Sequence, residues 1–262
     1  FCSCHLHIFM ASQSRVQTLH DLACIISRKG VEGETARRIC ELMDEFTCED
    51  LGITSGNVGK HMRGHLIEPR AITTHCIHSC RDFELVAFLF PAHASIPLHD
   101  HPDMYVFSKV LCGNLKMQSY DFLDPPSPQK LDALSFEEQQ AEDEGRPSPA
   151  SANVVFNARE RANMILTPEA PTFLLKPNFA NVHAFHAIMD TVVLDLLLPP
   201  YDEDQGRDCH YFARMPSARG QSDLAEVPES VSCFRVVSAP RDLVIRSGTY
   251  RGPTVMGSPS FN

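Results

Sequence analysis

Residues 96–121 read IPLHDHPDMYVFSKVLCGNLKMQSYD. Two β-rich runs, at 104–111 and 115–122, flank the turn residues Cys112-Gly113-Asn114. Further short runs precede them at 72–79 and 83–90 and follow at 154–156, 164–166, 172–175, 183–188, 191–198, 210–214, 233–237 and 243–245. Many short strands separated by turn residues are typical of a β-sandwich or β-barrel.

In the N-terminal part, apolar residues recur at a different spacing. Apolar residues recur at helical spacing over 13–29 and again over 34–47, and Gly30 is suited to end the first helix. Helices come first and strands follow without alternation, which favours a closed or sandwiched antiparallel β domain behind a helical cap.

The chain is expected to form one domain over residues 12–262, after a disordered tail at 1–11. Residues 12–65 form its helical part and residues 66–262 its barrel. The barrel part is interrupted at 124–151, where five prolines and an acidic run predict a solvated, disordered insertion.

Composition excludes several classes of protein. The 262 residues carry 23 Lys+Arg against 33 Asp+Glu, a net charge of −10, which argues against binding to nucleic acids or anionic membranes. No apolar run approaches the roughly 20 residues that span a bilayer. The ten cysteines are scattered along a chain too long to need disulfides, so they favour free thiols in a reducing compartment, the cytoplasm or also the nucleus.

One short motif could bind a metal ion. His99 and His101 are two residues apart, so on a strand they point to the same side of the barrel and Asp100 points outward. A third ligand must come from another strand, and His183 and His186 are the candidates; along one strand these two face opposite ways.

A glutamate that often follows such a motif is absent here, and Asp103 lies too close to replace it. Three neutral histidines would leave the metal its full 2+ charge, which favours an anionic ligand such as a thiolate. Three-ligand sites with open positions suit ferrous iron and O₂.

The sequence resembles the thiol dioxygenases of the cysteamine dioxygenase and plant cysteine oxidase family over roughly residues 13–255. The resemblance rests on residues 96–121, on His183, on VLDL at 193–196, on PPYD at 199–202 and on GRDCHY at 206–211. It implies a cupin-type antiparallel β-barrel (a double-stranded β-helix) with Fe(II) held by His99, His101 and His183.

The same resemblance implies an activity. Both atoms of O₂ are added to a thiol, so that cysteamine becomes hypotaurine or the N-terminal cysteine of a protein becomes a sulfinic acid, which serves oxygen sensing through protein degradation. Asp195 and Tyr201 match positions of the family's substrate pocket. Cys209 and Tyr211 match a pair that forms a thioether crosslink in the animal enzyme.

The sequence departs from the family pattern at two positions of interest. The family usually has glycine where this chain has Asp103, and often tyrosine where it has Cys112. Neither departure removes an expected metal ligand, but both leave the preferred thiol open.

Alternatives to these roles remain open. Asp195 could be a structural carboxylate, Tyr201 a packing corner, and Cys209 and Tyr211 merely neighbours on one strand face. Arg207 and Asp208 are expected to pair locally. The whole protein could instead be a metal-binding cupin with a regulatory or binding role, or a cupin isomerase or dioxygenase for another substrate. We expect a monomer.

Overall fold

The computed structural model describes residues 13–31, 33–54, 70–149, 153–216 and 231–257. The tail expected at 1–11 therefore lies outside the described residues. Two helices, α1 (Arg15–Lys29) and α2 (Gly33–Asp44), confirm the predicted helical pair. The side chain of Ser14 accepts a hydrogen bond from the backbone N–H of Gln17 and caps α1, and Gly30 ends the helix with φ 90°.

Twelve strands follow in the described residues, in the order β1 (Ile72–Ser79), β2 (Glu84–Phe90), β3 (Ser95–His99), β4 (Tyr105–Cys112), β5 (Leu115–Phe122), β6 (Phe156–Leu166), β7 (Phe173–Leu175), β8 (Val182–Ala187), β9 (Thr191–Leu198), β10 (Tyr211–Met215), β11 (Val231–Val237) and β12 (Ile245–Ser247). Short 3₁₀ helices lie at Glu49–Leu51 (η1) and Glu203–Gln205 (η3).

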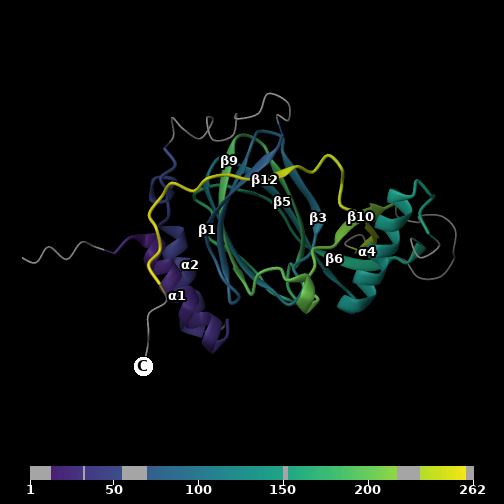
Figure 1. The fold of residues 1–262 in the computed structure, drawn as a ribbon, viewed down its shortest axis with the longest axis horizontal. Helices are drawn as coiled ribbons and strands as arrows, with labels where there is room; N and C mark the ends of the chain where they lie inside the picture. The colour runs from purple at the N-terminus through teal and green to yellow at the C-terminus, as the bar shows by residue number, and fades with distance from the viewer. Residues whose placement is uncertain (1–12, 32, 55–69, 150–152, 217–230, 258–262) are drawn as a thin grey trace, which may run out of the picture.

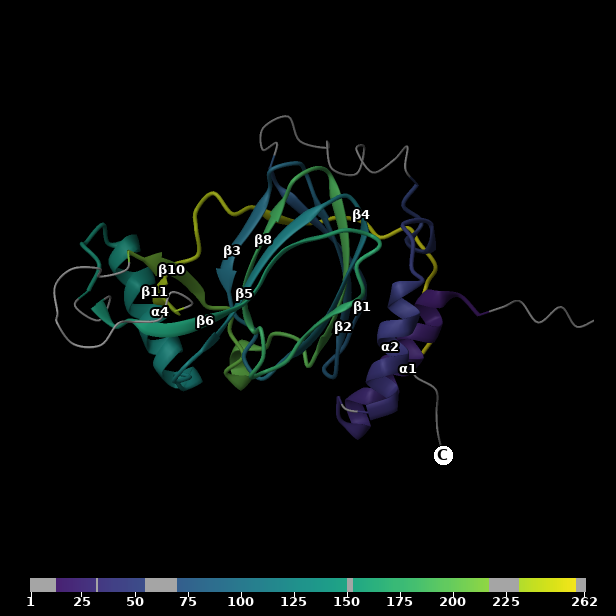
Figure 2. The same cartoon turned by 180° about the vertical axis from the view of Figure 1, so that it is seen from behind.

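The strands form two layers. One is a sheet of order β12-β1-β2-β9-β4-β7, and the other is a closed ring of order β10-β11-β6-β5-β8-β3. Among the described residues, all the strand pairs are antiparallel except β1 with β12. Figures 1 and 2 show α1 and α2 on one side of the barrel and a further helix, α4 (Pro128–Asp143), on the opposite side. The expected fold class, a cupin-type antiparallel β-barrel with a helical cap, is confirmed.

Strand β9 has one face towards the helical cap and the other towards the barrel interior. All eight of its residues are buried. Leu194 and Leu196 pack with the helices, whereas Val193 and Leu197 join the apolar clusters on the other face of the sheet. Since alternate residues of a strand face opposite sides, Asp195 points with Val193 and Leu197 towards the barrel interior.

The disorder expected within 124–151 is wrong for residues 128–143. Residues Pro128–Asp143 form α4, which has Ser127 as its N-cap and buries Leu131 and Leu134 against the ring strands. The many prolines and charges concealed the helix, although proline in the first turn is favourable. The division of the chain into residues 12–65 and 66–262 stays a prediction.

The segment 154–166 also differs from the prediction. The sequence indicated two short strands, but β6 runs without a break through polar residues from Phe156 to Leu166. Backbone hydrogen bonds to β5 and β11 on its two sides hold this strand, so its middle needs no apolar side chains.

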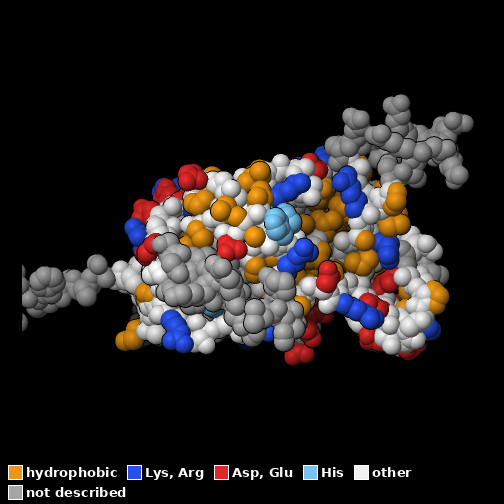
Figure 3. Space-filling view, turned by 90° about the horizontal axis from the view of Figure 1, so that it is seen from above, with side chains coloured by type: hydrophobic (Ala, Val, Ile, Leu, Met, Phe, Trp, Pro, Cys, Tyr) orange, Lys and Arg blue, Asp and Glu red, His pale blue; other side chains and the backbone are white. Residues whose placement is uncertain are grey.

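The distribution of surface charge and the state of the cysteines agree with what the composition predicts. On the face shown in Figure 3, acidic and basic side chains are interspersed with apolar ones rather than gathered into one patch. The eight cysteines within the described residues form no disulfide. In this part of the chain, no helix is long and apolar enough to cross a bilayer.

Replacing Gly113 with alanine is expected to destabilise the fold by about 3 to 4 kcal/mol. Gly113 has φ 83°, and an added Cβ would overlap the carbonyl oxygen of Asp190 and the hydroxyl of Thr191. Gly145 is the matched control, because it has φ 63° with nothing within 4 Å of an added Cβ. Its alanine variant should lose only about 1 kcal/mol in urea unfolding. Equal losses would contradict the steric argument.

Candidate metal centre

Three buried histidines meet inside the barrel. His99 ends β3 and lies directly opposite His183 of β8, and His101 follows two residues later, just beyond the end of the strand. The ring centroids of His99 and His183 are 4.4 Å apart, and His101 is 5.0 Å from each. One ligand nitrogen from each ring lies within 4.8 Å of the other two, so the cluster can hold a metal ion. His186 is exposed, in agreement with its predicted position on the face of the strand opposite to that of His183.

The second ring nitrogen of each histidine has a partner. The Nδ1 atom of His99 lies 2.8 Å from the carbonyl oxygen of Pro97, and that of His183 lies 3.4 Å from the carbonyl of Asn181. A carbonyl only accepts, so these nitrogens donate and leave Nε2 with its lone pair free. Such partners fix the ring orientation of metal-binding histidines.

Tyr201 plays the same part for His101. Its hydroxyl lies 2.7 Å from the carbonyl oxygen of Asp100 and 2.7 Å from Nδ1 of His101. Because the hydroxyl has one hydrogen, which the carbonyl of Asp100 takes, it accepts from Nδ1 of His101. The hydroxyl hydrogen of Tyr201 is therefore already donated to an acceptor within the protein.

Asn181 links two of the three histidines and was missed from the sequence. Its side chain accepts from the backbone N–H of His101 at 2.9 Å and donates to the carbonyl of His101 at 2.8 Å. Its own carbonyl faces His183. These bonds hold His101 in place although it lies beyond β3. The only signal for Asn181 in the sequence was its position two residues before the ligand candidate His183.

The electrostatics of the cluster suit a cation. Burial lowers the pKa of His99 and lowers the pKa values of His101 and His183 well below the ordinary range. The three imidazoles are therefore neutral donors at neutral pH, and no carboxylate of the described residues belongs to the cluster. Neutral imidazole is a common ligand for zinc, copper, iron and nickel, and the donor set fits a divalent transition metal.

Asp195 and Ser108 form a polar spot on the opposite sheet. They are register partners on β9 and β4. Oδ1 of Asp195 is buried without a hydrogen-bond partner among the described residues, and the Ser108 hydroxyl lies beside the carboxylate, where it acts to lower the pKa of Asp195. Burial raises the pKa of Asp195 to about 7. Unsatisfied polar atoms in a native interior call for an explanation, and a bound ligand is one.

Cys209 lies between the two tyrosines that the sequence selected. Its thiol is in hydrogen-bonding contact with the hydroxyls of both Tyr201 and Tyr211, and burial raises the pKa of Cys209 to about 12. Tyr211 pairs with His99 across β10 and β3, with ring centroids 6.3 Å apart. The structure thus places Cys209, Tyr201 and Tyr211 beside the histidines. The crosslink between Cys209 and Tyr211 stays a prediction.

Asp100 was expected to point outward from the barrel, but it is buried. Its carboxylate accepts from the backbone N–H of His210 at 2.8 Å and lies 3.1 Å from Nδ1 of His210. Nε2 of His210 lies 2.9 Å from Asp132 of α4. Two carboxylates that only accept require both ring nitrogens to be protonated. A buried imidazolium thus joins α4 to the strand that carries His99.

Replacing His210 with asparagine is expected to destabilise the protein by about 3 kcal/mol at pH 6 and by less at pH 8.5. Burial lowers the pKa of His210, but Asp100 and Asp132 outweigh it and raise the pKa above its ordinary value. A raised folded-state pKa stabilises below the unfolded value of about 6.5, and this stabilisation is lost as pH rises through the folded value.

Urea unfolding of wild type and variant at several pH values measures this difference. The control is Asp132→Asn, because the side chain of Asp132 is more exposed than that of Asp100. This variant should lose less free energy of unfolding than the His210 variant. A variant penalty that is the same at pH 6 and 8.5 would refute the ionic bridge.

The structure also bears on Arg207 and Asp103. Arg207 forms its ion pair with Asp202 at 3.3 Å, so the expected pairing with Asp208 is wrong. Asp103 is exposed and has φ 55°, a backbone conformation that glycine adopts more readily.

Known proteins match most of the chain. A family model described as PCO_ADO matches residues 42–255. The human protein "2-aminoethanethiol dioxygenase" is 31% identical over 226 residues, which cover 85% of this chain and 82% of the human one. Plant cysteine oxidase 2 of Arabidopsis thaliana is 29% identical over 252 residues, covering 92% of this chain and 83% of the plant protein.

Solved structures resemble part of the chain. KdgF from Halomonas sp. is 16% identical, covers 53% of this chain and 88% of its own, and has a TM-score of 0.32. An RmlC-like cupin protein from Desulfovibrio desulfuricans is 15% identical, covers 53% of this chain and 92% of its own, and has a TM-score of 0.30.

Proposed function

This chain belongs to the PCO_ADO family and is a thiol dioxygenase, and from that premise we propose that it uses Fe(II) and O₂ to oxidise an aminothiol to its sulfinic acid. The substrate is cysteamine or the N-terminal cysteine of a protein. The observation that carries the proposal is the cluster of His99, His101 and His183, which offers three neutral nitrogens and no carboxylate.

A ferrous ion on these histidines would supply the oxygen chemistry and a place for the substrate sulfur. The protein supplies orientation. Asn181 and Tyr201 fix the backbone and ring of His101, and the Pro97 carbonyl fixes the ring of His99. Both atoms of one O₂ enter the product, so a thiol RSH and O₂ balance to RSO₂H without another reactant.

Asp195 is proposed to bind the substrate amine. Cysteamine and an N-terminal cysteine share one unit, an amine separated from a sulfur by two carbons. A sulfur at the histidines would leave the amine to find a partner in the barrel interior, towards which Asp195 points. Its unsatisfied Oδ1 supports this role, because an ammonium donates a charge-assisted hydrogen bond to a carboxylate. The net charge of −10 also suits a cationic substrate.

A protein whose N-terminal cysteine is oxidised in this way would have its stability tied to oxygen supply. We propose that the chain does this as a monomer in the cytoplasm or nucleus, where its free thiols stay reduced.

Anaerobic loading with Fe(II), followed by O₂ and a thiol, tests the proposal. Cysteamine, free cysteine and a peptide with N-terminal cysteine are offered in parallel. A peptide with N-terminal serine and one with an acetylated N-terminal cysteine are the controls. Mass spectrometry should show two added oxygen atoms on cysteamine or the cysteine peptide and none on the controls.

The outcomes separate the candidate functions. Bound iron without oxygen uptake for any thiol would sink the proposal and favour a metal-binding cupin with a regulatory role. The ratio of kcat/KM for cysteamine and for the cysteine peptide decides between the two substrates.

A further inference from the structure

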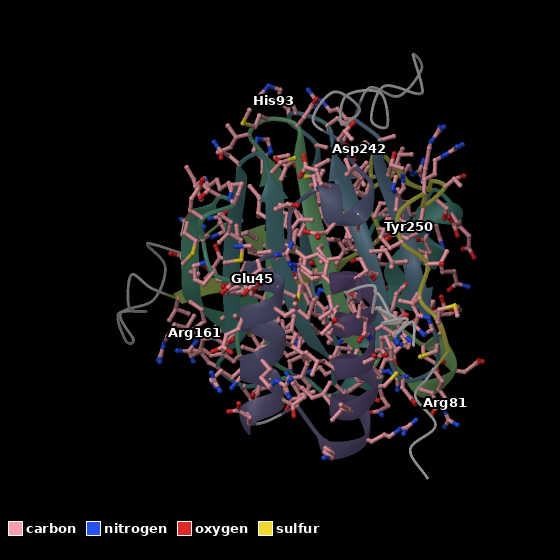
Figure 4. The ribbon with its side chains drawn as sticks, turned by 90° about the vertical axis from the view of Figure 1, so that its left-hand side faces the viewer. Glu45, Arg81, His93, Arg161, Asp242 and Tyr250 are labelled. Carbon is pink, nitrogen blue, oxygen red and sulfur yellow. The ribbon has the colours of Figure 1, made fainter. Side chains whose placement is uncertain are left out.

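Cys48 lies where the helical cap meets the barrel. It follows α2 and caps η1, and it is 7% exposed within the apolar cluster formed by the two helices and the outer face of β2, β4 and β9. Figure 4 shows α1 and α2 lying in front of the strands, with Glu45 at the end of α2, three residues before Cys48. This cysteine is thus fixed against the sheet.

Cys112 is directed to the same cluster by a bulge. It ends β4, and the register with β9 shifts between Val110 and Cys112. Val110 packs in the cluster of Phe90 and Met117, and regular alternation would send Cys112 there too. Instead Cys112 packs against the cluster of the helical cap, as a bulge permits by redirecting a side chain.

The two thiols are hydrogen-bond partners, and both residues pack at the apolar cluster of the helical cap. The bond to Cys48 is the main cause that lowers the pKa of Cys112 to about 7. The backbone N–H of Val192 also lowers it. The pKa of Cys48 is raised by the same bond and by burial. Cys112 is half-buried and Cys48 is buried, so an oxidant reaches Cys112 first.

We propose that Cys48 and Cys112 form a reversible oxidation site, which closes to a disulfide when the protein meets hydrogen peroxide. The Cys112 thiolate attacks one peroxide oxygen and becomes a sulfenate, and the other oxygen leaves as water after protonation. The sulfur of Cys48 then attacks the Cys112 sulfenic acid and forms the S–S bond, releasing a second water. Two thiols and one H₂O₂ balance to one disulfide and two waters.

The disulfide would tie the helical cap to the barrel. The closed loop of residues 48–112 contains β3 with His99. Closing so long a loop restricts the unfolded chain, so oxidation should raise the melting temperature on the order of 5 to 10 °C. A neighbouring second thiol also protects Cys112 from irreversible oxidation.

The test treats the reduced full-length protein with graded hydrogen peroxide, alkylates the remaining thiols and analyses tryptic peptides. The expected product joins peptides 39–60 and 110–116 with a loss of two hydrogens and is undone by dithiothreitol. Fragmentation assigns the link to Cys48 rather than Cys40, which lies in the same peptide. Cys76→Ser, which removes an exposed thiol of β1, is the matched control and should form the link to the same extent.

The variant Cys48→Ser separates this site from general oxidation. Without its partner, Cys112 should gain two oxygen atoms at a peroxide dose that gives the disulfide in wild type. If this variant fails to fold, the linked peptide of the wild type decides alone. The proposal fails if wild-type Cys112 is over-oxidised as fast as in Cys48→Ser, if it links to Cys40, or if both thiols stay alkylatable while Cys76 is oxidised.

Discussion

Replacing His183 with alanine is expected to lower iron binding by more than about 100-fold and to abolish thiol-dependent oxygen uptake. His183 supplies one of three nitrogens in the cluster and lies opposite His99 in the sheet. Two remaining imidazoles hold a divalent ion weakly, because the third nitrogen can only be replaced by water. Metal content after desalting and oxygen consumption with cysteamine measure the two effects.

His186→Ala is the matched control for this variant. It removes a histidine of the same strand that is exposed and bonded to Ser95. It should keep both iron and activity. Stoichiometric iron in His183→Ala, or equal losses in the two variants, would overturn the assignment of His183.

Asp195→Asn is expected to lower kcat/KM for cysteamine by about 100-fold or more while iron stays bound. The amide cannot offer a negative charge to the ammonium of the substrate. Ethanethiol, which has the same carbon chain and sulfur but no amine, provides the control substrate. Its oxidation should be equally slow in wild type and variant. A similar loss with both thiols would show that Asp195 acts on the metal site or on folding rather than on the amine.

The same variant is expected to stabilise the protein. Burial raises the pKa of Asp195 to about 7 from its ordinary value of 3.8. Between these values the folded carboxyl keeps a proton that the unfolded one releases, so stability falls as pH rises through this window. At pH 8 the asparagine variant should therefore be more stable, on the order of 2 to 4 kcal/mol. Urea unfolding at pH 4 and pH 8 checks the sign, because the gain should shrink at pH 4.

Most of the strands could be predicted from the sequence. Runs such as 72–79 and 191–198 are apolar or alternating and end at turn residues, and the observed β1 and β9 have the same bounds. These patterns are local, since the pleat alone decides which side chains share a face. Elements without this signal were missed. The helix α4 begins at Ser127 and Pro128, and its buried Leu131 and Leu134 were a sign of helix that the surrounding charges concealed.

The candidate site divides in the same way. The pair His99 and His101 could be found because two residues of spacing suffice to bring them together. The partners of that pair could not be found so simply. Asn181 and His210 reach the segment of Asp100 and His101 from 80 and 110 residues away, and no local pattern indicates such contacts.

By itself the sequence determined most of the strand pattern, the candidate pair His99 and His101, and the opposite faces on which His183 and His186 lie, because each is a matter of local spacing. That His101 faces the cluster although β3 ends at His99 depends on its bonds to Asn181. Only the tertiary structure decided that β8 lies beside β3, which brings His183 to the cluster, and that the bulge in β4 turns Cys112 towards Cys48. The physical reason is that strand pairing and register depend on how the apolar faces of distant segments pack.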